Sequence, residues 1–129
     1  MTTPGTDIIA QGKALADQVN PGVHDALLQR YEDKVPGLAD YVVGTAYGQI
    51  YNRPGLDLKT RQLATVAALT ALGGQTGPQL RVHVAASLKA GASETEVIEV
   101  ILQMSLYGGF PAMINALNVA LEVCEAHDD

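Results

Sequence analysis

Two long windows of the sequence carry no charged residue. They run from Gln62 to Leu80 and from Val100 to Leu121. The second window is interrupted at Gly108, Gly109 and Pro111 and also contains amide side chains, unlike the continuous apolar segment that spans a bilayer. Both windows therefore predict helices buried in a protein core, and neither predicts a transmembrane helix.

Helical periodicity dominates the chain, and few segments show the two-residue alternation of a strand. Asp57 and the pair Ser93 and Glu96 have the spacing of helix N-caps, and Gly73 is placed to end a helix. The pattern predicts an all-α fold of about six to seven helices, over residues 7–19, 23–34, 36 to before 54, 58–72, 78–90, 94 to about 107, and 111 to about 124.

Length and charge limit the class of protein further. A chain of 129 residues fits a single domain over residues 1–129. The net charge is −6, and the eight basic residues are scattered, which argues against a nucleic-acid or anionic-membrane partner. The start, M-T-T-P-G-T-D, lacks the features of a secretory signal, and the lone Cys124 has no partner for a disulfide within the chain. We therefore expect a cytoplasmic protein in which Cys124 is a small buried residue.

The last expected helix has too little polar surface for a solvent-facing helix. Its polar residues fall within one narrow arc, which contains Pro111, Asn115, Asn118 and Glu122. The rest of the circumference is apolar, so that it must be enclosed. One small subunit has difficulty covering this helix by itself, which predicts a closed, symmetric homo-oligomer.

His83 lies in a run of small and apolar residues. A helical wheel places it on one side with Gln79, Ala86 and Ala90. One interpretation is a core histidine bonded to a backbone carbonyl, and the other is a histidine that faces a ligand. No metal-ligand spacing and no G-x-S-x-G motif accompanies it, so the sequence predicts neither a metal centre nor a serine hydrolase.

Three ordered segments resemble the carboxymuconolactone decarboxylase family. They are A-Y-G-Q-I-Y-N-R-P-G-L-D-L-K-T-R-Q-L, Q-L-R-V-H-V-A-A-S-L-K-A-G-A-S-E-T-E-V-I-E-V and Y-G-G-F-P-A-M-I-N-A, at residues 46–63, 79–100 and 107–116. The resemblance covers about the last two thirds of the chain. It implies an alkylhydroperoxidase-D-like helical subunit in a ring-shaped homo-oligomer, a trimer or hexamer.

That superfamily includes thiol peroxidases with the pattern C-x-x-C-x-x-x-H. When the histidine of that pattern is aligned with His83, the cysteine positions hold Thr76 and Gln79. Neither side chain can form a thiolate or a disulfide. The comparison therefore argues against a thiol peroxidase.

The decarboxylase branch of the superfamily needs no cofactor. The resemblance of this chain to that branch implies a lyase of aromatic catabolism, which acts on a small acidic substrate such as a γ-carboxymuconolactone-like lactone. It suggests His83 as the proton donor or oxyanion partner, and Arg61 and Arg53 as holders of substrate carboxylates. The alternatives are a helix-start ion pair for Arg61 and a solvated loop position for Arg53.

The family pattern E-L-x-x-H has a carboxylate where this chain has Gln79, which can orient the imidazole but cannot titrate. Tyr107 and Phe110 could line the pocket or merely flank a tight turn. The rival hypothesis is a non-catalytic helical oligomer that binds a small acid.

Overall fold

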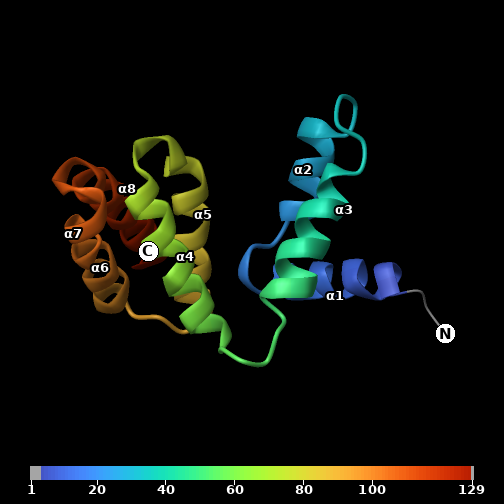
Figure 1. Cartoon of the computed structure of the whole chain (residues 1–129), viewed down its shortest axis with the longest axis horizontal. Helices are drawn as coiled ribbons and strands as arrows, with labels where there is room; N and C mark the ends of the chain where they lie inside the picture. The colour runs from blue at the N-terminus through green and yellow to red at the C-terminus, as the bar shows by residue number, and fades with distance from the viewer. Residues whose placement is uncertain (1–3, 129) are drawn as a thin grey trace. The chain divides into compact units, whose positions relative to one another are not determined.

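The computed structural model describes residues 4–128, with side chains described for residues 8–127, and the chain divides into two compact units, Met1–Leu56 and Asp57–Asp129. All regular structure in this described range is helical, as predicted. The first unit contains α1 (Pro4–Val19), α2 (Val23–Tyr31), α3 (Leu38–Val42) and the π-helix η1 (Val43–Ile50). The second contains α4 (Leu58–Leu72), the 3₁₀ turn η2 (Gly74–Thr76), α5 (Gly77–Lys89), α6 (Glu94–Gln103), α7 (Ser105–Gly108) and α8 (Phe110–Asp128) (Figure 1). The single domain over 1–129 stays a prediction.

The first unit is held together by very close packing of α1 against η1. A Cβ atom added at Gly12 would lie 2.5 Å from the carbonyl oxygen of Val43 and 3.1 Å from the backbone nitrogen of Gly48. The two helix backbones can approach this closely only because Gly12 on α1 and Gly48 on η1 have no side chains. The π-helical turn is visible in the bond from the Tyr51 N–H to the Ala46 carbonyl, which spans five residues at 2.7 Å.

The starts of two helices in the second unit confirm the caps predicted from the sequence. The Asp57 carboxylate accepts a hydrogen bond from the Thr60 N–H at 2.8 Å at the start of α4. At the start of α6, the Glu96 N–H donates to the Ser93 hydroxyl at 3.0 Å, and the Ser93 N–H donates to the Glu96 carboxylate at 2.9 Å. These bonds satisfy backbone donors that the helix itself leaves unpaired.

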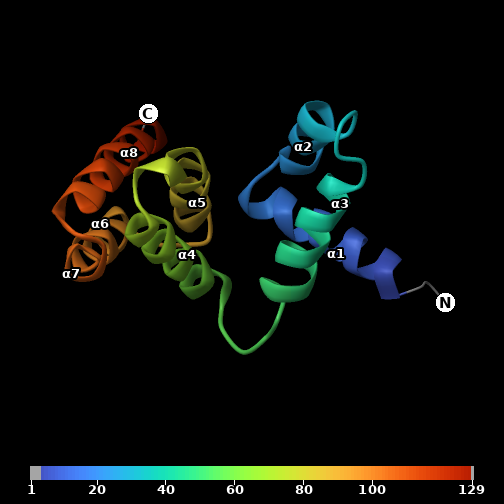
Figure 2. The same cartoon turned by 45° about the horizontal axis from the view of Figure 1, so that its top comes forward.

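One hydrophobic core fills the space between α4, α5, α6 and α8, and α4 lies beside α5 in both views (Figures 1 and 2). Its centre is formed by Val66, Val84, Val97 and Ile101, none of which is exposed. Cys124 is buried in the same core, as expected. In the described part of the chain, no helix combines the length and the apolar character that crossing a bilayer requires.

Some predicted helix boundaries were wrong. The helix expected to begin at Pro36 begins at Leu38, because Gly37 has a left-handed backbone conformation, with φ of 87°, that interrupts helical geometry. The second helix ends at Tyr31 instead of residue 34. The sixth was expected to continue to about Tyr107, but it ends at Gln103 and the chain restarts as the short α7.

Candidate functional site

His83 lies in the middle of α5, on the side that meets α4. Its side chain is half-buried, and its Nδ1 atom lies 2.8 Å from Oε1 of Gln62 on α4. The His83 carbonyl accepts a bond from the Ser87 hydroxyl one turn later, also at 2.8 Å. The imidazole is therefore fixed by a side chain from a different helix, 21 residues earlier in the sequence.

The local sequence of α4 explains how Gln62 reaches this position. The residues of α4 that are fully enclosed are Gln62, Val66 and Thr70, which follow one another at intervals of four and so form one stripe along the helix. Thr70 satisfies its hydroxyl by donating to the Val66 carbonyl at 2.8 Å. Gln62 has a longer side chain, and its Oε1 atom forms a hydrogen bond with the ring of His83.

The electrostatics of the pair favour a neutral imidazole. Burial lowers the pKa of His83 below its ordinary value of 6.5, because the charged ring loses hydration. Gln62 carries no charge that could oppose this effect. Since an amide oxygen can only accept, Nδ1 of His83 donates, and Nε2 of the neutral ring is the basic nitrogen.

The sequence placed Gln79 one helical turn before His83 as an amide that could orient the ring, and this role stays a prediction. Gln79 is exposed in the first turn of α5, whereas the amide bonded to the ring belongs to Gln62. Sequence reasoning missed Gln62. A signal was present, since Gln62 occupies the buried stripe of α4 at the start of a charge-free window.

The other predicted site residues are distributed over both units. Arg61 directly precedes Gln62 on α4 and is half-buried. Its side chain therefore leaves the same helical turn as that of Gln62, which is bonded to His83. Arg53 belongs to the first unit, where it is exposed in the turn after η1. Tyr107 on α7 and Phe110 at the start of α8 are 76% and 69% exposed. The contacts of these four side chains with a substrate stay predictions.

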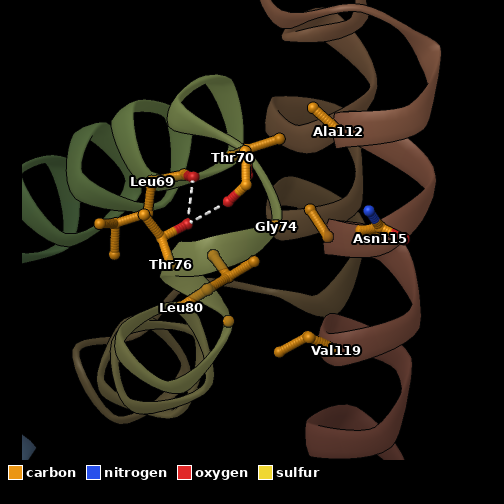
Figure 3. Close-up of a pocket in the computed structure, with 11 residues that line it drawn as sticks. Leu69, Thr70, Gly74, Thr76, Leu80, Ala112, Asn115 and Val119 are labelled. Carbon is orange, nitrogen blue, oxygen red and sulfur yellow. Dashed lines mark hydrogen bonds between the residues drawn. The ribbon is translucent and has the colours of Figure 1, made fainter.

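A small cavity of about 40 Å³ lies between α4, η2, α5 and α8. Figure 3 shows Leu69 and Thr70 of α4 on one side of it, and Asn115 and Val119 of α8 on the other. Neither His83 nor an arginine lines this cavity. Ligand pockets usually have several hundred Å³, so this space suits a few water molecules and not a lactone diacid.

Thr76 also lines this cavity, at one of the positions where the peroxidase pattern requires cysteine. Its hydroxyl lies 2.6 Å from the Leu69 carbonyl and 2.7 Å from the Gly73 carbonyl (Figure 3). The side chain thus satisfies carbonyl groups at the end of α4, which is a structural task. Threonine has no thiol to act as a peroxidatic group, and its hydroxyl is already bonded to backbone carbonyl groups.

Comparison with known proteins decides the family. The model of the carboxymuconolactone decarboxylase family matches residues 36–122, which is more than half of the chain. This protein belongs to the carboxymuconolactone decarboxylase family. The matched range includes Gln62, His83, Tyr107 and Phe110.

The chain is also similar to individual proteins. A 15.0 kDa uncharacterized protein from the nqo9-nqo10 intergenic region of Paracoccus denitrificans is 38% identical over 95% of this chain and 91% of its own length. The 4-carboxymuconolactone decarboxylase of Acinetobacter baylyi is 38% identical over 74% of this chain and 70% of its own length. Nitrosuccinic acid decarboxylase npaB of Metarhizium robertsii is 34% identical over 57% of this chain and 50% of its own length.

The two named activities belong to those relatives, and they differ in substrate while sharing the loss of CO₂. The family assignment therefore indicates decarboxylase chemistry more firmly than it indicates any one acid. In the part of the chain that the structure describes, no group of three or more histidine, cysteine, aspartate or glutamate side chains is placed to hold a metal ion.

Proposed function

We propose that this protein is a decarboxylase of a small carboxylic acid, with His83 as the proton donor and no cofactor. The observation that carries the proposal is the Gln62–His83 pair, which holds an imidazole of lowered pKa in one orientation. The family and the two relatives named as decarboxylases support the same reaction class.

The reaction requires one proton for each CO₂ released. The bond between the substrate carbon and its carboxylate breaks, CO₂ leaves, and the electron pair delocalises into an adjacent unsaturated carbonyl or nitro group. A protonated His83 then gives its Nε2 proton to carbon, and water restores that proton. The same residue can stabilise the developing oxyanion by donating a hydrogen bond before it transfers the proton.

The lowered pKa of His83 suits this role. An imidazolium that burial destabilises is a stronger acid than an exposed one, so it transfers its proton more readily to carbon. An anionic substrate beside the ring stabilises the imidazolium and so promotes protonation when it binds. We assign Arg61 and Arg53 to the substrate carboxylates, because guanidinium groups bind carboxylates through paired hydrogen bonds. Tyr107 and Phe110 are assigned to the pocket wall.

We also propose that the active form is a ring-shaped homo-oligomer, a trimer or hexamer, in the cytoplasm. An exposed apolar strip supports assembly, and we define it as Leu102, Leu106, Tyr107, Phe110 and Ile114, which are between 39% and 76% exposed. Exposed large apolar side chains on consecutive elements, here α6, α7 and α8, are typical of an interface between subunits. Phe110 and Tyr107 would then lie where subunits meet.

The decisive experiment measures CO₂ release by the purified protein from 4-carboxymuconolactone and from nitrosuccinic acid. We expect turnover of at least one of these acids, or of a related lactone or β-keto acid, and loss of about 100-fold or more in kcat for His83→Ala. His127→Ala is the matched control, because His127 is exposed near the end of α8. Unchanged turnover in His83→Ala would remove His83 from the mechanism.

One observation favours a non-catalytic oligomer that binds a small acid. The residue bonded to His83 and the residue one turn before it are both amides, Gln62 and Gln79, so neither can relay a proton. Tight binding of these acids without CO₂ release from any of them would support that alternative. A gain of decarboxylation in Gln79→Glu would show that the scaffold lacks only a titrating group.

A further inference from the structure

Gln62 is an unusual residue for a helix core. Its side chain is completely buried, and its Nε2 group has no hydrogen-bond partner among the described residues and no contact with solvent. An enclosed amide with unpaired N–H groups costs stability that leucine or methionine of similar size would not. The bond to His83 is therefore the feature that distinguishes glutamine at this position.

The geometry of that bond selects one tautomer of the ring. Oε1 of Gln62 lies 2.8 Å from Nδ1 of His83, and an amide oxygen accepts but cannot donate. The proton of the neutral imidazole is thereby held on Nδ1, and the lone pair is on Nε2. When the ring takes up a second proton at Nε2, the bond from Nδ1–H to Gln62 is unchanged. The pair therefore needs no rearrangement when His83 gains or loses the transferred proton.

We propose that Gln62 is a positioning residue that holds His83 in the Nδ1–H tautomer, so that Nε2 is the atom that gives the proton to substrate carbon. This inference rests on the proposed function for the identity of the reaction, and on the Gln62–His83 contact for the tautomer. Gln62 does not touch the substrate in this mechanism, because its free amide atom is enclosed. Its neutral amide also avoids the increase in pKa that a carboxylate would cause.

The test is a long-range ¹H–¹⁵N NMR spectrum of the full-length, ¹⁵N-labelled protein at about pH 8, where a neutral imidazole dominates. The signals of His83 are assigned by their absence from the spectrum of His83→Ala. In the wild-type protein we expect a protonated Nδ1 and an unprotonated Nε2. A wild-type ring protonated at Nε2 would overturn the inference without any variant.

Two substitutions separate positioning from packing. Gln62→Met keeps the volume but removes the acceptor, and we expect the ring to shift towards the Nε2–H tautomer that free histidine prefers. Gln62→Glu restores an acceptor and should restore the Nδ1–H tautomer. Thr70→Val is the matched control, because Thr70 is equally buried on α4 but bonds its own helix, and its substitution should leave the tautomer unchanged. An unchanged tautomer in Gln62→Met would contradict the proposal.

Kinetics supply a second readout with an acid that the wild-type protein decarboxylates. Gln62→Met should lower kcat about tenfold with little change in KM, because the substrate is bound by other groups. An equal kcat would count against the proposal. The tautomer measurement needs no substrate, so an Nδ1–H ring in a protein that releases no CO₂ would support the positioning role and refute only the proposed function.

Discussion

Replacing Gly12 by alanine tests the close packing of α1 against η1. The added Cβ would lie 2.5 Å from the Val43 carbonyl oxygen and 3.1 Å from the Gly48 nitrogen. Both neighbours are backbone atoms, so no side chain can turn away and α1 itself must move. Overpacking of this kind costs about 3 kcal/mol at the upper end of its usual range, and the better helix propensity of alanine returns about 1 kcal/mol. We expect a net loss of about 2 kcal/mol in the free energy of unfolding.

Urea unfolding, followed by the helical signal in far-ultraviolet circular dichroism, measures this loss at a fixed protein concentration. With a typical dependence of the free energy of unfolding on urea concentration, a loss of about 2 kcal/mol lowers the midpoint of urea unfolding by about 1 M. Gly77→Ala is the matched control, because Gly77 has ordinary helical geometry and a Cβ there meets no atom within 4 Å. Equal midpoints for Gly12→Ala and the wild-type protein would refute the close-contact reasoning, as would equal destabilisation by the control.

Three further predictions concern pH, capping and assembly. Because burial lowers the pKa of folded His83 below 6.5, its unfolded state binds more protons in mildly acidic solution. The wild-type protein should therefore lose stability relative to His83→Gln as pH falls from about 7 through the folded pKa, and an opposite slope in urea titrations would contradict the assigned direction. Ser93→Ala removes one half of the α6 capping box and should destabilise the protein by about 1 kcal/mol, measured by the same unfolding assay, with Thr95→Ala at an exposed position of the same helix as the control. Leu106→Asp places a charge in the apolar strip and should reduce the molar mass measured by light scattering to that of smaller species, and an unchanged mass would remove the strip from the interface.

The N-caps of α4 and α6 were the part of the fold best predicted from the sequence. The Asp57 cap and the Ser93–Glu96 capping box are local, because each uses atoms three residues apart. The charge-free windows predicted burial only in part, since they supply much of the core between α4, α5 and α8 but also contain the exposed side chains of Leu72, Leu106 and Phe110. The π-helical turn of η1 was not predicted, because its apolar pattern resembles that of an α-helix.

The candidate site was only partly predictable. The sequence singled out His83 as a partly enclosed histidine without metal or thiol partners, and the structure places it half-buried on α5. The sequence drew attention to its neighbour Gln79, which is exposed in the first turn of α5, whereas the amide bonded to the ring is Gln62. A search for polar residues within buried helical stripes would have pointed to Gln62 on α4.

By itself, the sequence determined the all-α class, the helix caps, the lack of a cysteine pair beside His83 and the resemblance to the carboxymuconolactone decarboxylase family. These features depend on residue types and on spacings within a few residues. Only the tertiary structure decided that Gln62 holds the ring, because residues 21 positions apart meet only when α4 packs beside α5. It also decided the protonation preference of His83, since desolvation depends on what surrounds a side chain and not on its neighbours in the chain.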